Sequence, residues 1–235
     1  MASSGATGRH RPPSLSDERA TSEQKRVAAA QAALLVQDGM KVGLGTGSTV
    51  AHLLPALARR GLRGLRCAAT SPATAAAALE LGLQIEPLDE LGGLDIAIDG
   101  ADQVDPACWL VKGGGGAHTR EKIVAAAAER FVVIVSAEKP VVALRPPVPL
   151  ELVAFGADTT LARLGSSRLR EQPPSPDGGL IADYFGSVGE PAALAQQLDA
   201  AVGVVEHGLF APEMVSLVLI GQPDGGVLSR PGEKL

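Results

Sequence analysis

The chain has 235 residues, of which 46% are hydrophobic, 20% are charged and 3% are aromatic, and its formal net charge at pH 7 is −5. This length and apolar content allow a sizeable core and exclude wholesale disorder. The scarcity of aromatic rings and the lack of a basic stripe argue against a nucleic-acid partner. No apolar run approaches the ~20 residues that span a membrane, so no membrane partner is expected.

The N-terminal segment and the cysteines bear on location. Residues 1–22 are rich in Ser, Ala, Arg and Pro and show no periodicity, so we predict a disordered tail. Asp17 and Glu18 argue against a transit peptide, and the segment lacks the apolar stretch that a secretory signal needs. Cys67 and Cys108 form neither a disulfide framework nor a CxxC metal motif. We expect inert thiols in a reducing compartment, and therefore a cytoplasmic protein.

The apolar pattern alternates between helix and strand periods up to Ser136. Pro55 should disturb one of the predicted helices unless that helix bends. Strand–helix alternation predicts a mostly parallel sheet with helices on both faces, and its ligand site lies at the carboxyl ends of the strands. The predicted helices are 23–37, 49–60, 72–81 and 117–128, and the predicted strands are 40–43, 65–69, 83–87, 94–98 and 131–135.

A different pattern follows the proline-dense joint at 145–147. Its order is close to β-α-β-β-α-β, which is typical of a small α+β domain. The predicted strands are 148–155, 180–184 and 202–206, the predicted helices are 158–169 and 191–200, and a last strand at 215–220 can return to the first sheet. We therefore predict a tail at 1–22, a catalytic domain at 23–145 plus 209–235, and a small α+β domain at 146–208.

A glycine-rich loop, Gly43–Thr49, lies between a predicted strand and a predicted helix. Amides at a helix N-terminus attract phosphate, and the loop adds several hydroxyl donors. A dinucleotide fingerprint would need a third glycine at Ser48 and an acid about 20 positions on, and a nucleotide P-loop would need Lys at Gly47. The loop therefore predicts a monophosphate cradle, although a tight strand-to-helix turn would also explain its glycines.

Two carboxylates, Asp99 and Asp102, stand at the end of an apolar strand. They could bind a metal, contact sugar hydroxyls or cap the following turn. A metal would need further ligands, and the four histidines of the chain show no recognisable ligand spacing. We therefore predict no metal, and both capping and work on hydroxyls or protons stay open.

Lys112 opens a run of four glycines, and Glu121 follows in or near the first turn of the next predicted helix. Four consecutive glycines cost conformational entropy, which argues against mere filler. They would let the backbone wrap around a small ligand and place amides on its oxygens. Taken singly, Lys112 and Glu121 would be read as solvated charges.

The fold should bring these three polar loops together at one edge of the sheet. A carboxylate can take a proton from one carbon and return it to the neighbouring carbon. A cation or amide donors would then stabilise the enediolate oxygen. The constellation therefore predicts an aldose–ketose isomerase that acts on a phosphorylated sugar.

Seven stretches match one known family: 42–55, 97–106, 111–132, 136–140, 147–153, 203–211 and 220–227. Together they resemble type A ribose-5-phosphate isomerases over about residues 20–227. The resemblance implies an α/β fold with a Rossmann-like, mostly parallel sheet domain and a smaller ferredoxin-like α+β domain. It also implies reversible isomerisation of ribose 5-phosphate and ribulose 5-phosphate through an enediolate, in the non-oxidative pentose phosphate pathway. No metal or organic cofactor is implied, and the assembly would be a homodimer or homotetramer.

The resemblance also assigns roles to residues. Glu121 would be the proton-transferring base, while Asp99 and Lys112 would assist ring opening and stabilise the enediolate. Lys25 matches a further basic position near the phosphate. The implied substrate contacts are Thr46, Gly47, Ser48, Thr49, Asp99, Gly100, Ala101, Asp102, Lys112, Gly113, Gly114, Gly115 and Lys139.

The chain departs from the family pattern at Gln103, where an acid is common, and at His118, where an apolar or small residue is usual. His118 could alter the local pH behaviour, but a tolerated loop substitution is the favoured interpretation. Two other classes of protein compete. A sugar-phosphate-sensing regulator would need a helix-turn-helix, for which the N-terminal segment is too short. A coenzyme A transferase would use a glutamate nucleophile, but the lysine–glycine run suits a small sugar better. Another pentose or hexose phosphate stays open as substrate.

Overall fold

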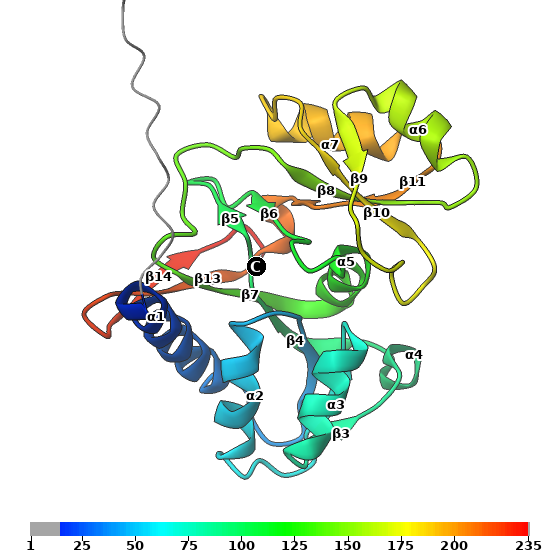
Figure 1. Ribbon diagram of the computed structural model, residues 1–235. Helices are drawn as coiled ribbons and strands as arrows, with labels where there is room; N and C mark the ends of the chain where they lie inside the picture. The colour runs from blue at the N-terminus through cyan, green and yellow to red at the C-terminus, as the bar shows by residue number, and fades with distance from the viewer. Residues whose placement is uncertain (1–14, 235) are drawn as a thin grey trace, which may run out of the picture.

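A seven-stranded sheet lies at the centre of the computed structural model, which describes residues 15–234 (Figure 1). Its strand order is β14-β13-β7-β4-β1-β2-β3, and every neighbouring pair is parallel except β13 and β14. The chain runs outward from β1 to β3 and then returns to β4 on the other side of β1. This reversal is the switch point at which open α/β sheets bind ligands. The strands are β1 (Lys41–Leu44), β2 (Arg66–Ala69), β3 (Gln84–Ile85), β4 (Leu94–Asp99), β7 (Ala128–Ser136), β13 (Leu217–Gly221) and β14 (Val227–Pro231).

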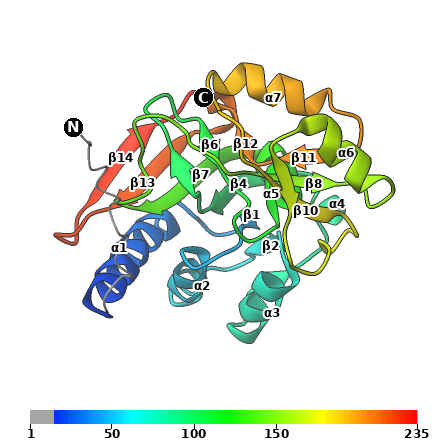
Figure 2. The ribbon, with the colours of Figure 1, turned by 45° about the horizontal axis from the view of Figure 1, so that its top comes forward.

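Helices cover both faces of this sheet (Figures 1 and 2). The strand β7 shows why, because Val132 and Ile134 enter one core while Phe131, Val133 and Val135 enter the other. A strand that is apolar on both faces is stable only when both are covered. One face carries α1 (Leu15–Ala33), α2 (Val50–Ala58) and α3 (Pro72–Glu80), and the other carries α4 (Leu88–Leu91) and α5 (His118–Ala126).

The first helix differs from the prediction. It begins at Leu15, so residues 15–22 belong to α1 and the predicted tail is wrong for that part. Asp17 and Glu18 lie in its first turn, where acidic groups favour helix formation. Residues 1–14 of the predicted tail lie outside the described residues. The second helix, α2, accommodates Pro55 in its interior.

A four-stranded antiparallel sheet in the order β11-β8-β10-β9 draws all its strands from residues 148–207. The order 4-1-3-2 within β-α-β-β-α-β is that of a ferredoxin-like fold. The predicted helix 158–169 is wrong at its end, because Gly165 terminates α6 with a φ of +72° and a strand follows. The elements are β8 (Val148–Leu152), α6 (Ala157–Leu164), β9 (Ser167–Leu169), β10 (Leu180–Tyr184), α7 (Pro191–Asp199) and β11 (Val204–His207).

A small antiparallel sheet links the two larger ones and was not predicted. Val111 and Leu209 contribute to the core of the four-stranded sheet, while Leu110 and Phe210 enter the core of the seven-stranded sheet. The predicted division into domains stays a prediction. Within the described residues, no helix is long and apolar enough to cross a bilayer. The linking strands are β5 (Gln103–Val104), β6 (Leu110–Val111) and β12 (Leu209–Phe210), and a 3-10 helix follows at Pro212–Met214.

Candidate active site

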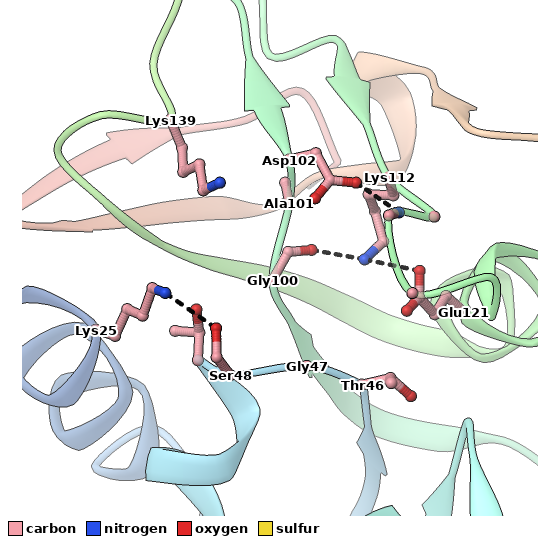
Figure 3. Close-up of a pocket in the computed structure, with 14 residues that line it drawn as sticks. Lys25, Thr46, Gly47, Ser48, Gly100, Ala101, Asp102, Lys112, Glu121 and Lys139 are labelled. Atoms are coloured by element: carbon pink, nitrogen blue, oxygen red, sulfur yellow. Dashed lines mark hydrogen bonds and ion pairs between the residues drawn. The ribbon is translucent and has the colours of Figure 1, made fainter. Parts of the chain in front are cut away.

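A pocket opens where the loops after β1, β4 and β6 meet (Figure 3). Every substrate-binding residue predicted from the sequence lines it except Asp99, which is 3% exposed and lies behind the lining. The contact of these residues with substrate stays a prediction. The lining consists of Lys25, Thr46, Gly47, Ser48, Thr49, Gly100, Ala101, Asp102, Lys112, Gly113, Gly114, Gly115, Glu121 and Lys139.

The loop after β1 packs closely on the end of β4. A Cβ at Gly45 would lie 1.9 Å from the Asp99 carboxyl group, so only glycine fits there. The main-chain N–H of Thr46 donates to Asp99 Oδ1 at 3.0 Å. Gly47 has a φ of +110°, which L side chains rarely adopt. These contacts hold the loop at the mouth of the pocket, directly before α2 begins.

Lys112 lies between two buried carboxylates. Its Nζ atom is 2.8 Å from Asp99 Oδ2 and 3.2 Å from Glu121 Oε2, and it donates to the Gly100 carbonyl oxygen at 2.6 Å. Figure 3 shows the side chain reaching from the loop toward Gly100 and Glu121. The ammonium group therefore has three acceptors, and two carboxylates share one positive charge.

This cluster sets the protonation state of Glu121. Burial, with the negative charge of Asp99 added to it, raises the pKa of the Glu121 carboxyl to about 7, and Lys112 opposes the shift. Burial alone would lower the pKa of Lys112, but Asp99 and Glu121 together raise it. Glu121 can therefore gain and lose a proton near neutral pH beside a lysine that stays charged, which suits a general base.

Asp99 is the innermost member of the cluster. Burial raises the pKa of its carboxyl group. In each hydrogen bond that the described structure gives it, however, Asp99 is the acceptor, and the donors are the Lys112 ammonium group and the main-chain N–H groups of Thr46 and Gly100. Three donors suit the ionised form, which only accepts. Asp99 thus fixes both the Lys112 ammonium group and the glycine-rich loop after β1.

We expect the acid limb of the pH profile of kcat/KM to lie near pH 7. The base must be ionised, so activity should fall about tenfold per pH unit below the pKa of Glu121, which is about 7. The charge of Asp102 also raises this pKa, so Asp102→Asn should move the limb to lower pH. Because the phosphate of free substrate titrates near pH 6, an unmoved limb would point to substrate rather than to Glu121.

The glycine run that follows Lys112 also lines the pocket, through Gly113, Gly114 and Gly115. Gly113 and Gly116 have φ values of +101° and +73°. The Gly114 N–H donates to Asp102 Oδ2 at 2.8 Å, and a Cβ at Gly114 would lie 2.8 Å from the same carboxylate. Asp102 therefore holds this loop, while it also lines the pocket.

Two lysines flank the end of the pocket that lies away from Glu121 (Figure 3). Lys25, from α1, donates to Ser48 Oγ at 3.0 Å. Lys139 follows β7 and also lines the pocket. Cations, hydroxyls and a helix N-terminus at one end suit a phosphate group. Lys25 is far from the loops in sequence, and only the family resemblance indicated it.

Gln103 differs from the family pattern for a local reason. Its side-chain amide donates to the Arg145 carbonyl oxygen at 2.8 Å and accepts from the Arg145 N–H at 2.8 Å. An ionised acid could only accept, so it could not make both bonds.

His118 is fully buried at the start of α5 and does not line the pocket. Within the described residues, neither ring nitrogen has a hydrogen-bonding partner. Burial lowers its pKa to about 3. The ring is therefore neutral at physiological pH, and its titration does not tune the base.

Replacing His118 by Leu is expected to stabilise the fold by about 1–3 kcal/mol at pH 7.5, because two unpaired buried nitrogens are removed. Folding lowers the pKa of His118 from 6.5 to about 3. The stability that the wild-type protein has above pH 6.5 is therefore lost progressively as the pH falls, because the unfolded chain binds the proton more readily than the folded one. By pH 5 the gap between the two proteins should widen by about 2 kcal/mol. Urea unfolding at both pH values measures this, and a less stable variant would contradict it.

A glycine-rich loop before a helix N-terminus and a buried carboxylate–lysine pair, at the switch point of a Rossmann-like sheet, are the features that the sequence predicts for a sugar-phosphate isomerase. Residues 66–225 match the family model of ribose 5-phosphate isomerase A (phosphoriboisomerase A). The chain belongs to this family.

Individual relatives agree. The chain is 44% identical over 224 residues to ribose-5-phosphate isomerase A of Caulobacter vibrioides, which covers 89% of this chain and 98% of that one. It is 45% identical over 217 residues to the Gluconobacter oxydans protein, with 86% and 94% covered. Among solved structures, ribose 5 phosphate isomerase A from Neisseria gonorrhoeae superposes with a TM-score of 0.86 at 32% identity, covering 90% of this chain and 97% of that one. D-ribose-5-phosphate isomerase in complex with phospho-erythronic acid superposes with a TM-score of 0.85 at 32% identity, covering 90% and 99%.

Proposed function

We propose that the chain interconverts ribose 5-phosphate and ribulose 5-phosphate through an enediolate, as a step of the non-oxidative pentose phosphate pathway. The observation that carries this proposal is Glu121, a buried carboxyl with a pKa of about 7 that lies 3.2 Å from Lys112 in the pocket wall. Family membership supports ribose 5-phosphate as the substrate. The lysines at one end of the pocket and Glu121 at the other support the orientation of that substrate.

The substrate would lie with its phosphate near Lys25, Ser48 and Lys139 and its reacting carbons near Glu121. Glu121 takes the proton from C2 of the open-chain aldose and returns it to C1, while the hydroxyl proton passes from O2 to O1. Its Oε2 atom lies 3.2 Å from the Lys112 ammonium group, and the carboxylate keeps further lone pairs that can take this proton. The isomerisation is balanced, because C1 is reduced as C2 is oxidised.

Lys112 would neutralise the charge that develops on the enediolate oxygens. Asp99 acts through Lys112, because it holds the ammonium group from behind rather than lining the pocket. Amides of the glycine run add donors on the same side. Such preorganised groups act most strongly in a site from which water is excluded.

The direct test is an assay of the purified protein with ribose 5-phosphate, alongside arabinose and allose phosphates. We expect ribulose 5-phosphate to form, and faster than the other ketose phosphates from their aldoses. If the folded protein forms no ribulose 5-phosphate, the proposal is refuted.

Phospho-erythronic acid offers a probe of the reacting end. It is the molecule in complex with the related D-ribose-5-phosphate isomerase. Its carboxylate carries two oxygens in one plane, as the enediolate does, so Lys112 would bind it well. We therefore propose that this acid binds in the same pocket here and competes with the sugar phosphate.

Treatment with EDTA is expected to leave the activity intact. The reacting end holds the ammonium group of Lys112 where a Lewis acid would otherwise act, and both neighbouring carboxylates are engaged with it. Rates before and after dialysis against EDTA measure this, and a loss of activity that a divalent ion restores would contradict a metal-independent mechanism.

We further propose a cytoplasmic homodimer or homotetramer, which the family resemblance alone supports. Light scattering after size exclusion separates these states, and a monomer that is fully active would contradict the assembly.

A further inference from the structure

The segment that joins β9 to β10, residues 170–179, lies against the glycine run and the first turn of α5. Figures 1 and 2 show it descending from the four-stranded sheet beside α5. None of its residues lines the pocket. Its contacts nevertheless reach the two elements that carry Lys112 and Glu121.

Arg170 is the central contact. Its Nη1 atom donates to the carbonyl oxygens of Gly113 and Gly114 at 2.9 and 3.0 Å. Its Nε and Nη2 atoms donate to the two carboxylate oxygens of Asp183, on β10, at 2.8 and 2.7 Å. Both side chains are mostly buried, with 17% and 15% exposed. The bidentate pair holds the planar guanidinium in one orientation.

These bonds determine where the loop amides point. In a trans peptide the C=O group and the following N–H group point in opposite directions. Because the carbonyls of Gly113 and Gly114 face Arg170, the N–H groups of Gly114 and Gly115 face the other way. The Gly114 N–H indeed donates to Asp102, on the pocket wall. The Gly115 N–H is therefore turned to the pocket side of the loop.

Glycine peptides rotate easily, so such an orientation needs restraints. The Gly116 N–H also donates to the Gly113 carbonyl oxygen at 3.0 Å, while Arg170 additionally holds the Gly114 carbonyl oxygen. We propose that Arg170, held by Asp183, is a positioning residue for the isomerisation. It fixes two peptide planes of the glycine run, so that the Gly114 amide meets Asp102 and the Gly115 amide faces the oxygens of the substrate. The inference rests on the proposed function, since it concerns the same pocket.

The same segment also holds the helix that carries the base. Thr119 and Ser175 both donate to the buried Glu151 carboxylate. Arg120 donates to both oxygens of Asp177 at 2.7 Å. The ferredoxin-like sheet therefore contacts the active-site loop and the first turn of α5 together, rather than standing apart from the chemistry.

The test compares Arg170→Met, Arg170→Lys and Asp183→Asn with a matched control, Arg168→Met. Arg168 lies two residues earlier in the same strand region, and its guanidinium lies over the Phe185 ring instead of the glycine run. For Arg170→Met we expect kcat/KM for ribose 5-phosphate to fall by about 10- to 100-fold, mostly through kcat. Binding of phospho-erythronic acid should weaken in parallel. Arg170→Lys and Asp183→Asn should show smaller losses, and Arg168→Met should stay within about twofold.

Thermal unfolding of each variant separates positioning from stability. Guanidinium ion added to folded Arg170→Met should restore part of kcat, which would not happen if the pair only stabilised the fold. Unchanged kcat and unchanged acid binding in folded Arg170→Met would overturn the inference, even if Tm falls. If that variant does not fold, Arg170→Lys and Asp183→Asn decide by the same criterion. An inactive wild type would refute the proposed function instead.

Discussion

Glu121→Gln is expected to bind substrate nearly normally and to lower kcat by about 10²–10⁴-fold. The amide keeps the shape of the side chain, but it cannot accept the proton from C2. Lys112 keeps two of its acceptors, Asp99 and the Gly100 carbonyl, so the pocket wall should stay in place. Transition-state stabilisation is lost while ground-state binding remains, which shows as a fall in kcat at nearly constant KM.

Steady-state kinetics and calorimetric binding of phospho-erythronic acid measure the two effects separately. Glu129→Gln is a suitable control, because Glu129 is exposed on β7 and does not line the pocket. Isomerisation at the wild-type rate by Glu121→Gln would remove this residue from the role of base. Loss of inhibitor binding together with activity would mean that the substitution disturbs the pocket instead.

Lys112→Ala is expected to lower kcat by about 10²–10³-fold, more than KM rises. Two effects combine. The developing enediolate charge loses its cation, and the two carboxylates lose the ammonium group that they share. Without that charge the pKa of Glu121 should rise further above its ordinary value, so the base is protonated at neutral pH.

This second effect gives the prediction a pH signature. The acid limb of Lys112→Ala should move to higher pH, and thermal stability should fall because a buried ion pair has lost one partner. Lys139→Met is the matched comparison: it removes a lysine from the other end of the pocket, so KM should rise while kcat changes little. A rise in KM alone for Lys112→Ala would make Lys112 a binding residue.

The sequence predicts six of the seven strands of the larger sheet because these apolar strands alternate with helices, but it does not predict β14. Phe131–Val135 is the clearest case, since its side chains enter two cores. It predicts the shorter elements poorly. The two-residue strands β5, β6 and β12 are too short to show a period, and β9 follows Gly165 within what reads as one helix.

The residues of the pocket were likewise predictable only in part. Loops at strand ends can be predicted to meet, and Thr46–Thr49, Lys112 and Glu121 do meet. Asp99 lies behind the wall because the adjacent glycine loop packs on its carboxyl, which spacing alone does not reveal. Arg170 gives no local signal at all, because its role depends on carbonyl groups far away in the sequence.

The small linking sheet has a consequence for folding cooperativity. The Lys112 N–H donates to the Gly208 carbonyl at 2.8 Å, and a Cβ at Gly208 would lie 2.2 Å from the Lys112 carbonyl oxygen. The backbone of Lys112 is thus hydrogen-bonded directly to Gly208, which follows β11 where the chain leaves the ferredoxin-like sheet. Local opening of that sheet would release the pocket lysine with it, so the two halves of the molecule should melt as one unit.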